Sequence, residues 1–187
     1  MDKKSLRKRQ IEMLKGISAL EYEQKCFQIE QRLYHSEEWK NSEVIAVTVS
    51  KHPEVNTWNM IKRAWEEGKK ICVPKCKAPT RELDFRELNS FTTLEKVYYD
   101  LYEPIPSRTN SVHTEQIHTV LVPGLAYTRK GYRLGFGGGY YDRFLTGYNG
   151  WTLSLAFDEQ IVEELPVEYF DIPVAKIITE SDSIQCG

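Results

Sequence analysis

The sequence predicts an α/β fold of three layers, in which a mostly parallel sheet carries helices on both faces and a pair of helices comes first. After about residue 40, runs typical of buried strands alternate with helical patterns, which is the order of βαβ units. The run EVIAVTVS at residues 43–50 is nearly continuous in β-branched and apolar residues, as in strands buried on both faces of a parallel sheet. The length of 187 residues suits one domain, so we expect a single α/β domain over residues 1–187.

Two helices are expected over residues 1–40, ahead of the first strand. The segment KKSLRKRQIEMLKG ends at Gly16, a residue common just after the last turn of a helix. A second helical segment, SALEYEQKCFQIEQRLYHS, starts behind Ser18, and Glu21 follows three residues later. This spacing is that of a capping box, in which the two side chains satisfy free backbone amides at the start of a helix.

The first strand is followed by a helix and a second strand. The helix begins near Asn56 or Thr57, places Trp58, Ile61 and Trp65 on one face, and stops at Gly68. The strand KICVPK comes directly after it, at residues 70–75. Together the three segments form a βαβ unit.

The rest of the chain continues the alternation less regularly. ELDFREL at residues 82–88 alternates like a strand, and residues 119–122 form a third buried strand. Five further assignments follow the same patterns: a glycine loop, a helix at 138–148, a strand at 152–158, a short helix at 161–166 and a final strand at 175–180.

Composition restricts the function. The formal net charge is -2, so the overall charge predicts no polyanionic partner. The sequence has no apolar run long enough to span a bilayer and no secretory signal pattern, so we expect a cytoplasmic protein that does not bind membranes. The four cysteines are scattered and the four histidines lack metal-binding spacing. Any metal would therefore be held by oxygen atoms.

The stretch RLGFGGGYYDRF, residues 133–144, is the strongest functional signal from the residues themselves. It lies between a buried strand and a helix, where glycines and unpaired backbone amides favour an anion, and Arg129, Lys130 and Arg133 add positive charge. Its spacing fits neither the dinucleotide-binding nor the Walker motif. A tight turn without a ligand is the alternative. Asp142 suits this loop if Mg²⁺ lies between it and a phosphate, and otherwise offsets the helix dipole.

The run VPGLAYTRKGYRLGFGGGYYDRFL resembles the signature of the 5-formyltetrahydrofolate cyclo-ligase family, also called methenyltetrahydrofolate synthetases. KKSLR near the N-terminus, VSKHPEVNT after the first strand, Glu103-Pro104 and FDIP at residues 170–173 also match the family. The resemblance covers nearly the whole chain. It implies ATP- and Mg²⁺-dependent conversion of 5-formyltetrahydrofolate into 5,10-methenyltetrahydrofolate, ADP and phosphate, through a phosphorylated formyl oxygen.

The resemblance also implies residue roles. Arg133 and Lys3 would be catalytic, and Asp142 and Asp171 would hold Mg²⁺. The implied ATP site joins the N-terminal helix to the glycine loop: Lys3, Lys4, Ser5, Leu6, Arg7, Arg133, Leu134, Gly135, Phe136, Gly137, Gly138, Gly139, Tyr140 and Tyr141. The implied folate site comprises Val49, Glu54, Phe136, Gly137, Gly138, Gly139 and Tyr140. Glu54 suits the N–H donors of a pterin ring.

Two positions depart from the family pattern. Ala175 stands four residues after Asp171, where the family often has an acidic residue, and Phe136 stands where some members have a basic one. The surroundings of the metal and the folate-facing side of the loop therefore stay open. The sequence leaves open the preference for polyglutamylated folates and the motion of the N-terminal helices. We expect a monomer.

Two other functions are compatible with parts of the sequence. A sugar-phosphate isomerase or a relative of CoA transferases would share the α/β sheet and an anion loop, but would not need Lys3, Arg7 or a metal-binding aspartate. A nucleic-acid-binding module would use the basic KKSLRKR segment and the loop tyrosines. The acidic charge balance disfavours that module, and titration with ATP and Mg²⁺ would separate the isomerase from the ligase.

Overall fold

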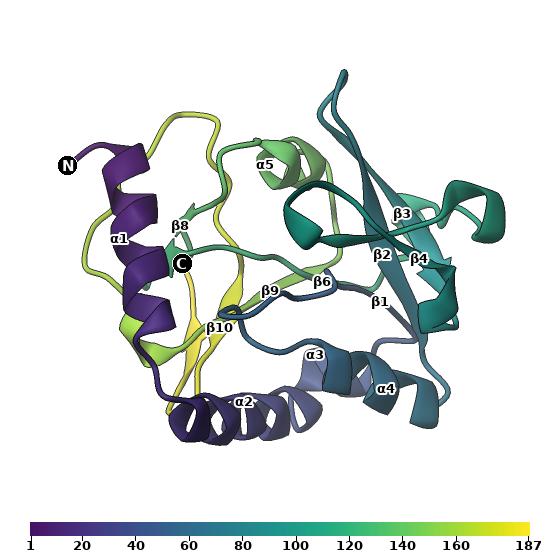
Figure 1. Cartoon of the computed structure of the whole chain (residues 1–187), viewed down its shortest axis with the longest axis horizontal. Coiled ribbons are helices and arrows are strands. Elements are labelled where there is room, and N and C mark those ends of the chain that lie inside the picture. The colour runs from purple at the N-terminus through teal and green to yellow at the C-terminus, as the bar shows by residue number, and fades with distance from the viewer.

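A seven-stranded sheet forms the centre of the computed structural model, which describes residues 1–187 (Figure 1). The strand order is β11-β10-β9-β6-β1-β2-β3. The five inner strands run parallel, and β3 and β11 are antiparallel strands at the two edges. The strands are β1 Val44–Ala46, β2 Lys70–Lys77, β3 Glu82–Leu88, β6 Thr119–Leu121, β9 Trp151–Leu155, β10 Lys176–Ile178 and β11 Ser183–Gln185. The predicted mostly parallel α/β fold is confirmed.

Helices cover both faces of the sheet. In Figure 1, α2, α3 and α4 lie along one side of the sheet and α5 lies on the other, while α1 stands beside the end that carries β10. A larger buried cluster packs under α1, α2, α3 and α4, and a smaller one packs against α5. The helices are α1 Lys3–Lys15, α2 Ala19–Tyr34, α3 Glu37–Lys40, α4 Trp58–Glu66 and α5 Tyr140–Leu145.

The first two helices begin and end close to the predicted residues. Ser18 Oγ accepts a hydrogen bond from the amide of Glu21, which is one half of the predicted capping box; the return bond from the Ser18 amide to the Glu21 side chain is not formed. Asp2 caps α1 by accepting a hydrogen bond from the amide of Ser5. In α4 the buried residues are Met60, Ile61 and Ala64. Trp58 and Trp65 lie on one face of α4, as predicted: both are half-buried and pack against the ring of Phe91.

The first strand is shorter than predicted. It ends at Ala46, so residues 48–50 leave the sheet. The Thr57 side chain forms hydrogen bonds with the backbone of these residues. Its hydroxyl donates to Thr48 O over 2.6 Å and accepts from the amide of Ser50 over 2.9 Å. The Ser50 hydroxyl in turn accepts from the amide of Thr57 over 2.9 Å. These side-chain bonds replace the ladder that would have extended β1 and turn the chain toward α4.

The segment at residues 161–166 is not the predicted short helix. A single 3-10 turn, Asp158–Gln160, comes just before it, and Ile161 forms an isolated bridge with Tyr127. The amide of Val162 donates to Tyr127 O over 2.8 Å, so the start of this segment pairs with a residue far away in the sequence. The helix predicted at 138–148 is also shorter, at Tyr140–Leu145.

Two small hairpins complete the fold. One pairs β4 (Leu94–Lys96) with β5 (Tyr102–Pro104), and the other pairs β7 (Ala126–Tyr127) with β8 (Arg133–Leu134). The second hairpin lies between the central strand β6 and the glycine loop, so it decides where that loop sits. No helix combines the length and the apolar character that crossing a membrane requires.

Candidate active site

The glycine loop connects the β7–β8 hairpin to α5. Gly137 has φ +101° and Gly139 has φ +72°, both in the left-handed region, where a side chain would be strained. The loop contacts a second hairpin, because Arg81 at the β2–β3 turn donates to Gly138 O over 2.7 Å. Glycine at Gly137 and Gly139 is thus required by the backbone. Both residues are exposed, and the backbone amides of residues 136–139 donate no hydrogen bond within the protein.

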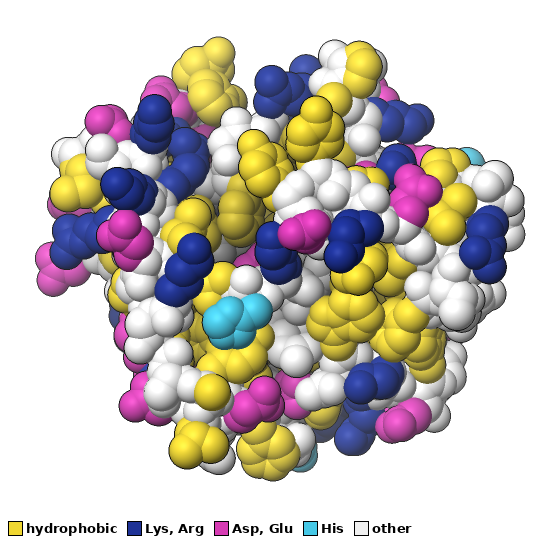
Figure 2. Space-filling view, in the orientation of Figure 1, with side chains coloured by type: hydrophobic (Ala, Val, Ile, Leu, Met, Phe, Trp, Pro, Cys, Tyr) yellow, Lys and Arg dark blue, Asp and Glu magenta, His cyan; other side chains and the backbone are white.

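The N-terminal helix α1 meets the loop, as expected for a shared site. Arg7 Nε donates to Gly135 O over 2.8 Å, across 128 positions of sequence. Its guanidinium lies against Gly137, where a Cβ would come within 3.4 Å of Cζ. One turn earlier, Lys3 Nζ lies 3.5 Å from Asp171 Oδ2. Figure 2 shows Lys and Arg side chains gathered over α1 on this face of the molecule.

The other predicted residues of α1 lie differently. Lys4 and Ser5 are exposed, and the Ser5 amide is bonded to the helix cap. Leu6 is half-buried and packs against the main core cluster. Of the five residues predicted from this helix, Lys3 and Arg7 are therefore the two whose side chains reach the loop and the segment around Asp171.

Arg133 is buried and already has partners. Its side chain is 5% exposed. Nη1 donates to Ile172 O over 2.8 Å, and Nη2 donates to Asp142 Oδ1 over 3.0 Å. The same carboxylate oxygen accepts from the amide of Ile172 over 3.0 Å. Arg133, in β8, thus connects α5 to the segment after Asp171 by hydrogen bonds. Its charged group is buried beneath the glycine loop and is not presented at the surface.

The two aspartates predicted to bind metal lie in neighbouring segments, because Asp142 is bonded to the residue that follows Asp171. Asp171 Oδ2 accepts from the amide of Glu168 over 2.8 Å, and its second oxygen has no hydrogen bond. Asp142 Oδ2 is likewise free of hydrogen bonds. No three His, Cys, Asp or Glu side chains cluster as a complete protein cage. Two free carboxylate oxygens fit Mg²⁺, which usually takes one or two carboxylates and completes its shell with water and phosphate. Ala175 supplies no further ligand.

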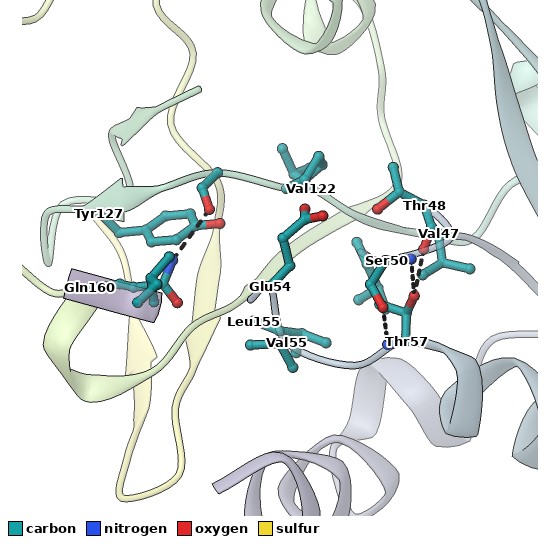
Figure 3. Close-up of a pocket in the computed structure, with 14 residues that line it drawn as sticks. Val47, Thr48, Ser50, Glu54, Val55, Thr57, Val122, Tyr127, Leu155 and Gln160 are labelled. Carbon is teal, nitrogen blue, oxygen red and sulfur yellow. Dashed lines mark hydrogen bonds between the residues drawn. The ribbon is translucent and has the colours of Figure 1, made fainter. Parts of the chain in front are cut away.

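A narrow cavity of about 40 Å³ opens beside Glu54, at the end of the sheet where the chain leaves β1 and β6. Figure 3 shows the Glu54 carboxylate pointing into it. Val49 does not line this cavity, because its side chain is buried in the main core. The lining residues are Leu14, Val47, Thr48, Ser50, Glu54, Val55, Thr57, Leu121, Val122, Pro123, Gly124, Tyr127, Leu155 and Gln160.

Glu54 is held from both sides. Its Oε1 accepts from the amide of Lys51 over 3.0 Å, and its backbone oxygen accepts from the Tyr22 hydroxyl over 2.7 Å. Burial raises the pKa of Glu54, and the hydrogen bond from the Lys51 amide partly offsets the rise. A partly desolvated carboxylate with an oxygen to spare is suited to accept hydrogen bonds from ligand N–H groups.

The loop residues predicted to contact both ligands do not line this cavity. Phe136 is 55% exposed and points away from the core, and Tyr140 is half-buried. The Tyr141 hydroxyl is buried and has no hydrogen-bond partner. The shared folate contacts from residues 136–140 stay a prediction that requires the loop to approach the cavity.

Sequence reasoning missed three residues near these sites. Tyr127 and Gln160 line the cavity, and Arg81 holds Gly138. Tyr127 lies inside the signature run at residues 122–145, but nothing in that run marks it as a cavity residue, and Gln160 carries no local signal. Each reaches the cavity through contacts with distant segments. Arg81 has φ +60° at its turn, but nothing in its neighbours indicates that the turn reaches the glycine loop.

Comparison with known proteins shows which sequences this chain resembles along its length. The sequence model of the 5-formyltetrahydrofolate cyclo-ligase family matches residues 1–180. The 5-formyltetrahydrofolate cyclo-ligase of Mus musculus is 28% identical over 189 residues, covering 95% of this chain and 93% of the mouse protein. That of Escherichia coli K12 is 30% identical over 141 residues, covering 73% of this chain and 78% of its own.

Solved structures agree on the fold. The 5,10-methenyltetrahydrofolate synthetase of Aquifex aeolicus superposes with a TM-score of 0.86 at 29% identity, over 99% of this chain and 93% of the other. The 5,10-methenyltetrahydrofolate synthetase of Mycoplasma pneumoniae superposes with a TM-score of 0.77 at 23% identity, over 96% of this chain and 99% of the other. This second superposition supports the fold. With a family match over nearly its whole length, the chain belongs to the 5-formyltetrahydrofolate cyclo-ligase family.

Proposed function

We propose that this chain catalyses the ATP- and Mg²⁺-dependent cyclisation of 5-formyltetrahydrofolate to 5,10-methenyltetrahydrofolate, with release of ADP and phosphate. Membership of the cyclo-ligase family supports the reaction. The observation that carries the site is the contact of Arg7 with Gly135, which joins a basic helix to a loop whose backbone amides have no acceptor in the protein. We also propose that the enzyme is active as a monomer.

The ATP phosphates would bind between α1 and the glycine loop. Lys3 and Arg7 supply positive charge from one side, and the amides of Gly137, Gly138 and Gly139 supply hydrogen-bond donors from the other. Lys3 is 30% exposed and its ammonium faces Asp171, so it is free to exchange that carboxylate for a phosphate oxygen. Lys3 would then stabilise the charge that develops on the transferred phosphoryl group.

Asp142 and Asp171 would hold Mg²⁺ through their free oxygens. The ion would neutralise phosphate charge and help to align the phosphoryl group. Arg133 would act through Asp142 and Asp171, because its two hydrogen bonds fix the orientation of Asp142 and of the backbone next to Asp171. Its catalytic contribution would be to position the carboxylates and to add positive charge to the site.

The folate would present its pterin edge to the cavity and its formyl group to the phosphates. The formyl oxygen is a poor leaving group until it is phosphorylated. It attacks the γ-phosphorus of ATP, the bond from that phosphorus to the bridging oxygen breaks, and ADP leaves, so that the formyl oxygen carries a phosphoryl group. N10 then attacks the formyl carbon, the C–O bond breaks, and phosphate and the N10 proton leave. Glu54 fixes the pterin, so the formyl oxygen is held in line for transfer.

The test is to follow methenyl absorbance after mixing the purified protein with 5-formyltetrahydrofolate, ATP and Mg²⁺. We expect product to form only when all three are present, with one ADP released per methenyl group. Omission of each component in turn, and replacement of ATP by a non-hydrolysable analogue, serve as controls. Absence of product with all components present, from protein shown to be folded, would reject the proposed function.

A further inference from the structure

The hydroxyl group of Tyr127 is the least explained polar group beside the proposed folate site. The residue is 0% exposed, and its Oη has no hydrogen-bond partner. An unpaired buried hydroxyl costs free energy, so such groups are rare unless they have a use. Its ring lines the same cavity as Glu54, and Figure 3 shows the hydroxyl directed into that cavity.

No neighbour in the protein satisfies this hydroxyl. The Ser154 hydroxyl interacts with that of Tyr127 and lowers the pKa of Tyr127, but its own proton goes to Val122 O over 2.7 Å, and the two hydroxyls lie outside the geometry of a full hydrogen bond. Burial raises the pKa of Tyr127, so the phenol keeps its proton at neutral pH. The group is therefore a neutral O–H donor in the wall of the cavity.

The fold fixes this donor in place. The backbone oxygen of Tyr127 accepts from the amide of Val162, and Gln160 Nε2 donates to Gly124 O over 3.3 Å and to Leu125 O over 3.1 Å. Gly124 leaves the space that the hydroxyl occupies, because a Cβ at that position would lie 2.9 Å from Oη. A rigid donor of this kind can be ready for a ligand before the ligand arrives.

The size and polarity of the cavity point to the edge of a ring. A volume of about 40 Å³ holds roughly three water-sized groups, given that one water occupies about 10–15 Å³ on this measure. One wall offers an acceptor, the Glu54 carboxylate, and another offers a donor, the Tyr127 hydroxyl. A reduced pteridine has the matching edge: the C2 amino group and N3–H are donors, and the adjacent C4 carbonyl is an acceptor.

We propose that Tyr127 is a specificity-determining residue that donates a hydrogen bond from its hydroxyl to the C4 carbonyl of the pteridine while Glu54 accepts from the C2 amino group and N3–H. This inference rests on the proposed function. It assigns the recognition of the oxo group, which a carboxylate cannot bind, to a separate residue.

The closing experiment measures binding in the absence of ATP, so that no turnover occurs. Calorimetric titration with 5-formyltetrahydrofolate is compared between the wild-type protein and Tyr127→Phe. We expect the folate Kd to rise about three- to tenfold, the range for loss of one neutral hydrogen bond, while the ATP Kd stays unchanged. The Tm of the ligand-free variant should equal or exceed that of the wild type, because an unpaired hydroxyl has been removed.

The matched control is Tyr148→Phe, which removes a hydroxyl bonded to Ile117 O outside the cavity. This control should lower the Tm and leave the folate Kd unchanged. An unchanged folate Kd in Tyr127→Phe would overturn the inference alone, and a lowered Tm with unchanged Kd would show that the hydroxyl serves the fold. If the wild-type protein fails to bind 5-formyltetrahydrofolate, the proposed function falls, and this inference falls with it.

Discussion

The guanidinium of Arg133 donates to the carboxylate of Asp142 over 3.0 Å, and this pair lies behind the glycine loop. The arginine is 5% exposed on its side chain and the aspartate 25%, so the pair is partly shielded from water. One oxygen of Asp142 is used by this contact and by the amide of Ile172, which leaves the other for a metal. The aspartate is thus held in one orientation before any ligand binds.

Asp142→Asn tests the metal assignment. We expect turnover to fall about 100-fold or more, the scale of losing one stabiliser of transition-state charge. The Mg²⁺ concentration for half-maximal rate should rise, since an amide is a weaker ligand for a hard cation. Rate is measured against Mg²⁺ concentration, with thermal melts as a folding control. Asp182→Asn, which alters an exposed ion pair with Arg129, is the matched variant. Superimposable Mg²⁺ curves would remove Asp142 from the metal site.

Arg133→Ala should affect both ligand binding and stability. We expect ATP binding to weaken by about 1.5 to 3 kcal/mol, or roughly 10- to 150-fold, because a charge and the positioning of Asp142 are lost. The buried contacts with Ile172 O and Asp142 also disappear, so the Tm should fall. Arg63→Ala removes an arginine that pairs with Glu67 and lies over the Tyr34 ring, far from the proposed phosphate site; it is the control and should leave the ATP affinity unchanged. Unchanged ATP affinity would exclude Arg133 from the phosphate site.

Removal of residues 1–8 should abolish turnover and leave the sheet folded. The deleted segment supplies Lys3 and Arg7, whereas Leu14, the buried residue of α1 in the main core, remains. Circular dichroism and thermal melting check the fold, and methenyl absorbance checks activity. Arg7→Ala should reproduce most of the loss, while Arg9→Ala, at an exposed position of the same helix, should not. Full activity in the truncated protein would refute an ATP site on α1.

Glu54→Gln keeps the shape of the side chain but replaces a carboxylate with a group that is half donor. The folate Kd should rise roughly 10- to 150-fold, the range for hydrogen bonds to a charged group, and the ATP Kd should change little. Both constants are measured by calorimetry, with the exposed Glu23→Gln as the control. Equal losses for the two ligands would indicate a general folding defect instead of a pterin contact.

The pKa of Glu54 predicts two opposite dependences on pH. Burial raises the pKa of Glu54, so the folded chain binds the carboxyl proton more tightly than the unfolded chain does. The contribution of Glu54 to the free energy of unfolding is therefore present at low pH and is lost as pH rises through the folded-state pKa. Folate binding needs the carboxylate, so the folate KM should rise on acidification, beginning at a higher pH than for an exposed glutamate. Both effects should vanish in Glu54→Gln. A pH profile identical in the two proteins would show that Glu54 does not bind folate.

Several features of this protein follow from local patterns in its sequence. The spacing of apolar residues and the caps at Gly16 and Ser18 place the first two helices nearly to the residue. The apolar runs place the inner strands of the sheet, and the glycine and arginine content of residues 133–144 indicates an anion site. Helix periods, strand burial and capping depend on neighbours a few positions away, so the sequence displays them directly.

Tertiary structure decided what depends on distant partners. The Thr57 side chain ends β1 at Ala46, and Ile161 and Val162 pair with Tyr127 where the composition suits the start of a helix. Arg7 reaches the glycine loop, and the Tyr127 hydroxyl reaches the cavity of Glu54, only because the sheet brings these segments together. A side chain's burial and partners are properties of the packed whole, so its residue type and its neighbours in the sequence could not reveal them.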